Sequence, residues 1–506
     1  MKPKPKIYRL WEAIPGFFAW MVILFPIWGA YLVPKAVAYF VISFLVYWLY
    51  QSFKSSYLAV FGYFKIKADK KRDWLESFKE DFRANWLHYA DINHVIIISS
   101  YKELNDVIEM AFGSLAAQVD IDLKKLHVVL AQEARAGQEN NQKTVDYFLS
   151  NYKDTFGSLT FTEHPANLPG ETPGKHTNEA WAAKYFKKEF ITTNPRSLKK
   201  FSINHLTLTS CDVDTIFHPK YFSALTYRFA SNPNRYVRFW QSPIFWHHNI
   251  NDVPGPIRII GTMGNVIHIA NIQEPDGLFF NYSCYSSSYK LIDLAGYWDP
   301  DMIPEDWHIF LQAFFASGGK ALVEPIFLPT IVDAPEGKTY WLALKNRYNQ
   351  CLRHAWGAID IPYTIEQARI HTEIPLITRV LRIFKIIQTH LIWSSNWFVL
   401  TLGTSLPVIL NPHFFQTAIG YNLPRISNLI LTICLIPLFI LIILDWKLRP
   451  VSQKKGFKVF IKNLLQWPFF PIATLTMSVL PGLHSHTRLL FGKKLEYKTT
   501  VKKASV

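Results

Sequence analysis

Two aspartates that directly follow a strand-like run have the spacing most suggestive of chemistry. Asp212 and Asp214 come after the alternating run Leu206–Cys211 and are separated by one residue. Side chains placed in this way at the end of a strand can turn together toward one hard cation once the chain leaves the sheet. A divalent ion held there is well suited to binding a diphosphate. The same Asp-x-Asp pattern occurs without a preceding strand pattern at two other places, Asp120/Asp122 and Asp299/Asp301.

A second acidic pair, Glu305 and Asp306, follows Pro304. Proline suits the first turn of a helix, and acidic residues there complement the helix dipole, which explains the pair without any chemistry. The functional interpretation makes Asp306 a general base for an acceptor hydroxyl, kept ionised by the dipole. The sequence alone leaves both interpretations open.

A lysine lies ahead of a predicted helix in the segment Pro173–Trp181. Gly174 permits close backbone approach, and Thr177 or Asn178 can cap the helix. Lys175 is then a candidate contact for a phosphate or a nucleobase. Taken alone, Lys175 is better explained as a solvated lysine in a loop.

Arg347, Gln350 and Arg353 recur every three residues on one face of a predicted helix, with Gly357 as its stop. Their basic side chains could balance the charge of a diphosphate. The alternative is a cationic amphipathic helix on a membrane surface, and the two interpretations are compatible.

The region from about residue 90 to 360 contains the elements that must position these residues. Four strands are predicted at Val95–Ile98, His127–Leu130, Leu159–Phe161 and Leu206–Cys211, with apolar residues at helical spacing between the first two. Such alternation predicts an α/β fold with a mainly parallel sheet and helices on both of its faces.

Polar residues follow three of these strands. They lie in the segments Ser99–Glu103, Gln132–Arg135 and Asp212–Asp214. Ligands of open α/β sheets bind beyond the carboxyl ends of the strands, so we expect these segments to converge on one crevice.

The ends of the chain read as membrane segments. Ala13–Pro34 and Ala36–Phe53 carry no charge, and each is long enough to cross a bilayer of about 30 Å. His390–Leu410 and Ile426–Leu444 are two further predicted spans. Asn463–Thr487 is also uncharged but contains prolines, so a re-entrant or interfacial hairpin competes there with a straight helix.

The net charge of +16 arises mainly from basic runs that flank the hydrophobic segments. The positive-inside rule then places both termini and the middle of the chain in the cytoplasm. This position of the charge favours membrane lipids over nucleic acid as the partner. The four cysteines are isolated, which indicates a reducing compartment. The predicted spans contain almost no ionisable residues, which argues against a proton or ion relay.

Together these motifs resemble the membrane-bound glycosyltransferases of family 2, which include the cellulose- and hyaluronan-synthase-like enzymes. The resemblance covers about residues 90 to 360 and runs in the family's order. Its motifs are matched by Val95–Glu103, Pro173–Ala180, Asp212–Asp214, Glu305–Asp306 and Gln350–Arg353.

The resemblance implies a GT-A fold and an inverting, metal-dependent transfer from a nucleotide sugar. Asp212 and Asp214 would hold Mg²⁺ or Mn²⁺, and Asp306, with Glu305, would form the catalytic base motif. The implied nucleotide-sugar contacts are Ser100, Tyr101, Glu103, Glu133, Lys175 and Asn178. The implied diphosphate and acceptor contacts are Gln350, Arg353, His354 and Trp356.

The sequence departs from the family pattern in two places. Gln132-Glu133-Ala134 stands where aspartates usually hold the uridine, so the donor, a UDP- or GDP-sugar, is left open with Glu133 as the substitute. His354 occupies the place of the expected tryptophan, and Trp356 comes two residues later. Because that tryptophan helps to seat a growing polymer in the family, the resemblance supports processive synthesis less strongly.

An intact base favours a hydroxyl acceptor, because a polyprenyl phosphate is already anionic and needs no base. The acceptor would be a lipid-linked sugar, a lipid or a growing glycan. Phe239–Trp246 and Asn251–Pro254 could form interface helices that deliver it, or aromatic packing at the membrane surface.

We therefore expect a multi-pass protein, in the plasma (inner) membrane, with a cytoplasmic glycosyltransferase domain. Residues 1–64 would form two N-terminal spans, 65–375 the GT-A domain with interface helices, and 376–506 a C-terminal membrane region. A processive polysaccharide synthase that exports its polymer is the alternative, and a non-catalytic nucleotide-binding membrane protein is a second one. The sequence leaves partner subunits open.

Overall fold

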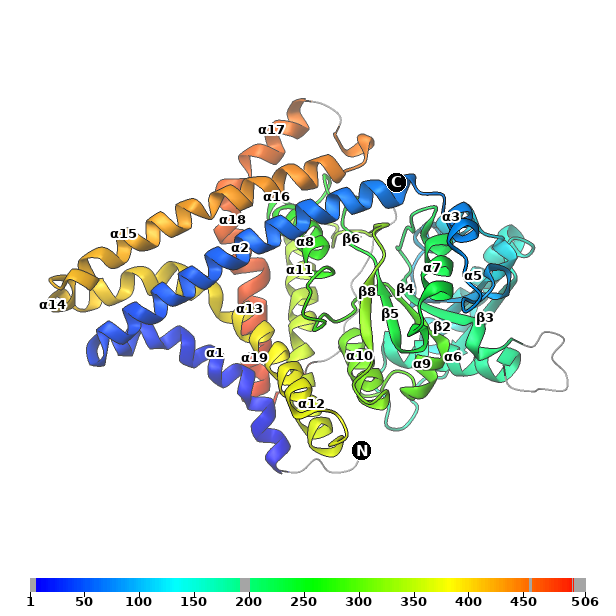
Figure 1. The fold of residues 1–506 in the computed structure, drawn as a ribbon, viewed down its shortest axis with the longest axis horizontal. Helices are drawn as coiled ribbons and strands as arrows, with labels where there is room; N and C mark the ends of the chain where they lie inside the picture. The colour runs from blue at the N-terminus through cyan, green and yellow to red at the C-terminus, as the bar shows by residue number, and fades with distance from the viewer. Residues whose placement is uncertain (1–5, 192–200, 455–456, 494, 496–506) are drawn as a thin grey trace.

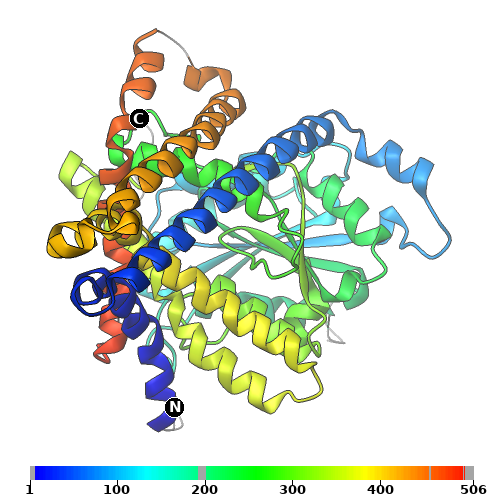
Figure 2. The same cartoon turned by 60° about the vertical axis from the view of Figure 1, so that its left-hand side comes forward.

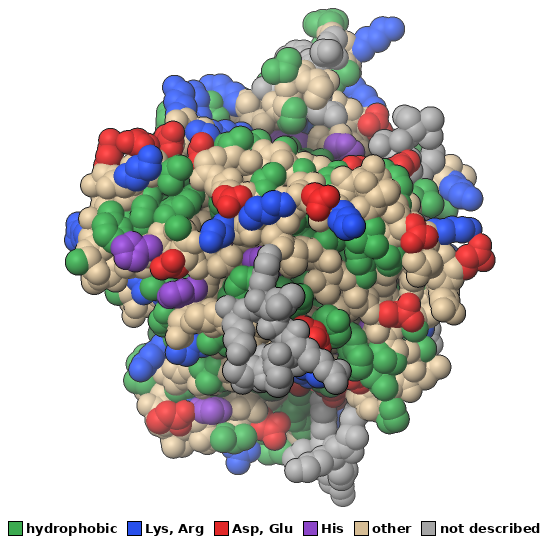
Figure 3. All heavy atoms as spheres, turned by 90° about the vertical axis from the view of Figure 1, so that its right-hand side faces the viewer, with side chains coloured by type: hydrophobic (Ala, Val, Ile, Leu, Met, Phe, Trp, Pro, Cys, Tyr) green, Lys and Arg blue, Asp and Glu red, His purple; other side chains and the backbone are tan. Residues whose placement is uncertain are grey.

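The protein consists of an α/β body beside a group of long helices (Figure 1). The structure, a computed structural model, describes residues 6–191, 201–454, 457–493 and 495. On the face of the α/β body turned away from the long helices, basic and acidic side chains are interspersed (Figure 3).

A seven-stranded sheet forms the centre of the α/β body, in the order β3-β2-β1-β4-β7-β5-β8. Strands β1 to β4 pair in parallel, and β7 runs antiparallel to both of its neighbours. The mainly parallel α/β sheet predicted from the sequence is confirmed. The strands are β1 Asn93–Ser99, β2 Leu126–Glu133, β3 Ser158–His164, β4 Leu206–Asp212, β5 Arg238–Gln241, β7 Tyr285–Ser288 and β8 Leu322–Pro325.

Helices cover both faces of the sheet because its central strands are apolar on both faces. In β1, Val95 and Ile97 point into one core cluster, whereas Ile96 and Ile98 point into another. Helices α4 Asn105–Ala116, α5 Gln138–Tyr152 and α7 Tyr221–Ser231 pack on the Ile96 side. Helices α6 Lys175–Phe186, α9 Tyr289–Leu294 and α10 Glu305–Ala316 pack on the Val95 side.

The aromatic run Phe239–Trp246 does not form interface helices, which were one of the two interpretations of it. Its residues lie in β5 and in the short strand β6 (Ile244–Phe245), which pairs with β9 (Thr330–Ile331). Phe239 and Trp240 are fully buried. Side chains on both faces of β5 meet core clusters, which is why an aromatic strand could be mistaken for a membrane-surface segment.

Four segments among the described residues are long and apolar enough to cross a membrane: Ile7–Leu32, Pro34–Lys71, Ala418–Leu448 and Phe457–Leu490. The predicted span His390–Leu410 lies in α13 (Leu376–Leu410), which is not among these four. The other long helices are α1 Lys6–Leu32, α2 Pro34–Lys71, α15 Ala418–Ile433 and α16 Leu435–Leu448.

The segment expected as a hairpin or a straight helix is a series of helical pieces. It runs through α17 Phe457–Leu465, α18 Phe470–Thr474, the π-helical turn η10 Leu475–Val479 and α19 Leu480–Leu490. Pro468 and Pro471 occupy the first turns of η9 (Trp467–Phe469) and α18, where the missing N–H group would have no helical partner in any case, whereas Pro481 directly follows the π-helical turn η10.

Several helices of the α/β body contact the long helices. Helix α8 (Gly255–Asn271) packs against α2, α16 and α18, α11 (Tyr340–Ala355) against α19, and α12 (Asp360–Ile370) against α13. Helix α2 crosses from the long helices to the α/β body in both views (Figures 1 and 2). The carboxyl ends of β1, β2 and β4 lie on the side of the long helices, because Ser99, Glu133 and Asp212 line one cavity together with residues of α2 and α13.

Candidate active site

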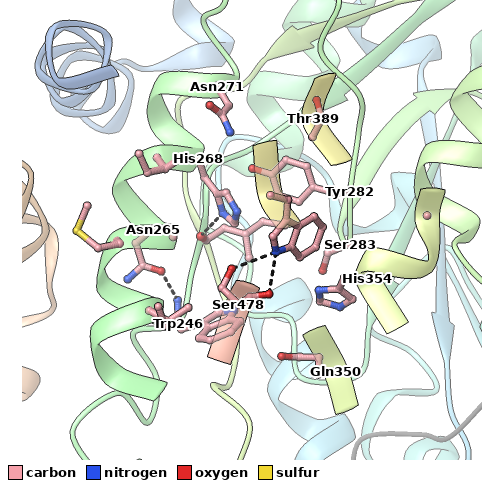
Figure 4. Close-up of a pocket in the computed structure, with 18 of the residues that line it drawn as sticks. Trp246, Asn265, His268, Asn271, Tyr282, Ser283, Gln350, His354, Thr389 and Ser478 are labelled. Carbon is pink, nitrogen blue, oxygen red and sulfur yellow. Dashed lines mark hydrogen bonds between the residues drawn. The ribbon is translucent and has the colours of Figure 1, made fainter. Parts of the chain in front are cut away.

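A cavity of about 1400 Å³ begins at the carboxyl ends of β1, β2 and β4 and extends between the long helices. The three polar segments predicted to converge all contribute lining residues. The predicted site residues that line the cavity are Ser100, Tyr101, Glu133, Lys175, Asn178, Asp212, Asp214, Glu305, Asp306, Gln350, Arg353 and His354. Figure 4 shows part of this lining, with Ser283, Gln350 and His354 around the same space.

The two other predicted site residues have supporting positions. The Glu103 carboxylate accepts hydrogen bonds from Ser100 Oγ, at 3.1 Å, and from the backbone N–H of Tyr101, and so fixes the turn after β1. Trp356 is buried in the core of the α/β body. Helix α11 ends at Ala355 with Trp356 as its C-cap, directly before Gly357 as predicted, and a 3₁₀ turn, η7 (Trp356–Ile359), then leads into α12.

Lys175 lies at the centre of the site. Its Nζ is 3.1 Å from Asp212 Oδ1, 3.7 Å from Glu305 Oε1 and 3.8 Å from Glu179 Oε1. Burial disfavours its charge, but the surrounding carboxylates dominate and raise the pKa of Lys175 well above its usual value. Lys175 is thus a buried cation in a ring of acids rather than a solvated loop lysine.

The predicted cap of the helix after Lys175 is wrong. Lys175 is the first residue of α6 and Gly174 is the N-cap, without a side-chain hydrogen bond. Thr177 and Asn178 lie inside the helix, where Thr177 Oγ1 donates to the carbonyl of Gly174 at 2.9 Å. Asn178 Nδ2 donates to the carbonyl of Ala131 at 2.7 Å, which ties α6 to β2.

Asp306 occupies the first turn of α10, as predicted. Its Oδ2 accepts a hydrogen bond from the backbone N–H of Ser283 at 2.7 Å. Its Oδ1 is buried and has no hydrogen-bond partner among the described residues. A buried carboxyl oxygen without a donor is costly and requires an explanation, and a role as a reacting group is one explanation.

The electrostatics of Asp306 differ from the expectation that the helix dipole keeps it ionised. Burial of the carboxyl group and the neighbouring Glu305 raise its pKa to about 7, while Lys175 and the Ser283 N–H oppose the shift. Desolvation and the neighbouring carboxylates therefore outweigh the groups that favour the charged form. A carboxyl group with a pKa near neutrality is suited to accepting and releasing a proton.

Asp212 and Asp214 were predicted as metal ligands. Asp212 Oδ2 accepts from Ser283 Oγ at 3.1 Å, and Asp214 Oδ2 accepts from the N–H of Asp333 at 3.2 Å. No cluster of three or more His, Cys, Asp or Glu side chains suited to a metal occurs within the described ranges. Two carboxylates nevertheless fit Mg²⁺, which is typically held by one or two carboxylates together with substrate phosphates.

The basic face predicted on α11 borders the cavity. Arg347 Nη1 donates to Gln350 Oε1 at 2.9 Å, and its guanidinium lies 5.0 Å from the ring centre of Trp246. Arg347 is mostly buried, so this face looks into the protein rather than onto a membrane surface. Gln350, Arg353 and His354 line the cavity beside it.

Ser283 is the residue that the sequence did not reveal. Its N–H donates to Asp306, its hydroxyl to Asp212, and its carbonyl accepts from Lys175 Nζ at 3.1 Å. Ser283 adopts a left-handed backbone conformation with φ of 55°, which is uncommon outside glycine. It joins the predicted base, one of the two predicted metal ligands and the central lysine.

No family model matches the chain, and no curated protein matches it. Among solved structures, the chain is similar to a mannosyltransferase from Pyrobaculum calidifontis in complex with GDP-Man and Mn²⁺, at 13% identity and a TM-score of 0.42, over 79% of this chain and 99% of that one.

Residues 1–349 of S. aureus TarS match at 8% identity and a TM-score of 0.33, over 67% of this chain and 90% of that one. GalNAc-T7 with UDP, GalNAc and Mn²⁺ matches at 9% identity and a TM-score of 0.29, over 61% and 55%. Similarity at this level does not establish a family.

Proposed function

We propose that the protein is a membrane-embedded, inverting glycosyltransferase of the family 2 type, with a GT-A fold. It transfers a sugar from a nucleotide sugar, a UDP- or GDP-sugar, to a hydroxyl acceptor. The basic runs beside the apolar segments support a cytoplasmic active site in a plasma (inner) membrane protein.

The observation that carries this proposal is the state of Asp306 in its cavity. One carboxyl oxygen is fixed by the Ser283 N–H, and the other is buried without a partner. Lys175 and Asp212 lie in the same cavity, 3.1 Å from each other. A general base thus shares one space with groups suited to a diphosphate.

Several groups in the cavity would hold the donor. The phosphates would lie near Lys175 and Arg353, and Gln350 would orient them by hydrogen bonding. The nucleoside would lie near Tyr101 and Glu133, at the ends of β1 and β2. Asp212 and Asp214 would hold Mg²⁺ or Mn²⁺, which when bound supplies Lewis-acid stabilisation of the departing diphosphate.

In the transfer step, the Asp306 carboxylate accepts the proton of the acceptor hydroxyl. The acceptor oxygen forms a bond to the anomeric carbon from the face opposite the diphosphate. The bond between the anomeric carbon and the phosphate oxygen breaks, and its electron pair leaves with the nucleoside diphosphate. A single displacement of this kind inverts the anomeric configuration.

The test is Asp306→Asn in detergent-purified protein with native membrane lipids and a panel of nucleotide sugars. Removing a general base should lower the transfer rate by about 100-fold or more. Binding of the nucleoside diphosphate, measured by calorimetry, should survive. Asp214→Asn should instead weaken donor binding and its dependence on divalent ions.

Asp106→Asn is the matched control for Asp306→Asn. Asp106 is the second residue of α4, the same helical position that Asp306 has in α10, but it does not line the cavity. The two variants lose the same favourable interaction with a helix dipole. Transfer by Asp306→Asn at the wild-type rate would contradict the role of Asp306 as the base. Equal losses of transfer in both variants would mean that Asp306 only stabilises its helix.

A further inference from the structure

The cavity does not end at the groups that would hold the donor. It continues between α2, α13, α16, α18 and η10, where Tyr47, Gln51, Thr389, Leu438 and Ser478 are among its lining residues. Figure 4 shows Thr389 and Ser478 around the same space as His354 and Gln350. The transfer site is therefore continuous with a space between helices of the membrane region.

The part of this space nearest the transfer site is polar and aromatic. Gln388 Nε2 donates to Tyr47 Oη at 3.2 Å, and Trp393 Nε1 donates to the carbonyl of Ser478 at 3.1 Å. Asn396 Oδ1 is buried without a hydrogen-bond partner among the described residues. Amide groups and indole rings that line one space are suited to an uncharged, hydroxyl-rich group.

Charged side chains are confined to the inner boundary of this space. Lys54 of α2 pairs with Glu274, and Lys385 of α13 pairs with Asp276 at 3.4 Å. Beyond these pairs, the described lining residues from α2, α13, α15, α16 and α18 are uncharged. Since both lysines are neutralised by their own partners, the boundary provides little excess charge for an anionic head group.

The outer part of the space is aliphatic on one side. Leu431, Leu435, Leu438 and Leu441 line it from α15 and α16. Their spacing of four and three residues places them on one helical face. Such a wall is suited to hydrocarbon and not to a sugar chain.

The space closes before the far ends of its helices. Beyond Tyr47, α2 continues for roughly 20 Å toward Pro34, and beyond Thr401, α13 continues for roughly 14 Å toward Leu410, at 1.5 Å per residue. These stretches pack together in a cluster that contains Val41, Leu45, Phe414 and Leu423. A Cβ on Gly403 would lie 3.3 Å from Val41 Cγ2, so α2 and α13 are in close contact there.

We propose that this blind extension is the binding site of the acceptor, and that the acceptor is a membrane lipid. It has an uncharged, hydroxyl-bearing head group and a hydrocarbon tail. The head lies among Gln51, Trp393 and Asn396, with its hydroxyl toward Asp306, and the tail lies along the leucines of α15 and α16. This inference rests on the proposed transfer function and specifies its acceptor.

The closed end distinguishes this proposal from export of a polymer. A growing glycan would need a path that continues past Thr401 and Tyr47, where the described helices pack closely. A lipid needs only the inner half of the bilayer, whose full hydrocarbon thickness is about 30 Å. One sugar is then added in each encounter.

The experiment uses the full chain, purified in detergent, and the radiolabelled nucleotide sugar that it consumes. Native membrane lipids are separated by anion exchange into a neutral and an anionic fraction, and each is offered as acceptor. The expected product is chloroform-soluble, forms with the neutral fraction and is heavier than its precursor by one sugar. A water-soluble polymer, or a product only with the anionic fraction, would overturn the proposal.

Two variants of α16 test the site itself. Leu438→Trp fills the aliphatic wall, whereas Ile436→Trp places the same side chain at an exposed position that does not line the cavity. Leu438→Trp should lower transfer to lipid at least about tenfold, equivalent to about 1.4 kcal/mol, and Ile436→Trp should not. Hydrolysis of the donor without acceptor should be unchanged in both.

The donor reaction separates failure of this inference from failure of the proposed function. If Leu438→Trp transfers sugar to lipid at the wild-type rate, the wall does not hold the acceptor. If the wild-type protein consumes donor but glycosylates neither lipid fraction, the acceptor is not a lipid. If no donor is consumed under any condition, the proposed transfer function itself fails.

Discussion

At the scale of single residues, the protonation of Asp306 governs the proposed reaction. Burial and Glu305 raise its pKa to about 7, so the carboxylate that a base requires is lost as the pH falls below that value. The transfer rate at saturating donor should therefore rise with pH and level off above about pH 8. Single-turnover measurements would show this as one ascending limb.

Donor affinity provides the internal control for this pH dependence. Because Asp306 acts on the acceptor proton, the affinity for the nucleoside diphosphate should not follow the same limb. A transfer rate that is flat from about pH 5.5 to about pH 8.5 would indicate an ordinary, fully ionised carboxylate. It would contradict the raised pKa of Asp306 but not its role as a base, which Asp306→Asn tests.

Residue types explain which parts of this site could be predicted. Asp212, Asp214 and Glu133 have ionisable side chains and follow predicted strands, and the carboxyl ends of parallel strands lie at one edge of the sheet. Ser283 could not be found in this way. Two of its three contacts use backbone atoms, and they depend on a left-handed turn that nothing about a serine indicates.

At the scale of elements, a buried histidine anchors the helix that carries Asp306. His308 Nδ1 lies 2.7 Å from Asp360 Oδ1 of α12, and its Nε2 lies 2.8 Å from Asp299 Oδ2. Burial disfavours the charged ring, but the two carboxylates prevail and raise the pKa of His308 to about 9. Helix α10 is thereby fixed to α12 and to the turn before it.

The stability of this anchor should depend on pH. A histidine whose pKa is raised on folding contributes stability that is fully present below about pH 6.5 and is lost as the pH rises through about 9. The unfolding temperature of the wild type should fall across that window, and that of His308→Gln should fall less. His371→Gln, at a surface pair with Glu373, is the control and should behave as the wild type.

Periodicity predicted the elements better than their detailed ends. A continuous apolar run such as Val95–Ile98 allows only a buried strand at that length, and β1 confirms it. The aromatic run around Trp240 has no such single interpretation, because burial inside a sheet and burial at a membrane surface select the same residues. The prediction of the α6 cap was wrong because a threonine hydroxyl can bond either at the start of a helix or within it, and Thr177 bonds within it.

At the scale of the whole molecule, a buried polar network fixes the α/β body to the long helices. Asp445 of α16 has Oδ1 3.0 Å from both His247 Nε2 and Asn265 Nδ2, and its Oδ2 accepts from Arg449 Nε at 2.6 Å. Arg449 also donates to Thr262 Oγ1 of α8 at 2.8 Å. The cavity spans this junction, so its shape depends on the network.

Replacing Asp445 alone should lower the free energy of unfolding more than replacing Asp445 and Arg449 together. Asp445→Leu leaves the buried Arg449 without its carboxylate, which should destabilise the protein by about 3–5 kcal/mol. Asp445→Leu combined with Arg449→Met removes both charges and should recover most of that loss. Thermal unfolding in detergent measures both variants, with Glu139→Leu, in an exposed pair with Lys143, as a control expected to cost under about 1 kcal/mol.

The same variants test whether the junction shapes the acceptor site. Asp445 lies four residues from Leu441, the innermost leucine of the aliphatic wall, so a shift of α16 relative to α8 moves that wall. Asp445→Leu should therefore reduce transfer to lipid more than donor hydrolysis, and the double variant should restore both. If the single variant lowers both reactions equally, the network stabilises the fold as a whole and does not set the geometry of the acceptor site.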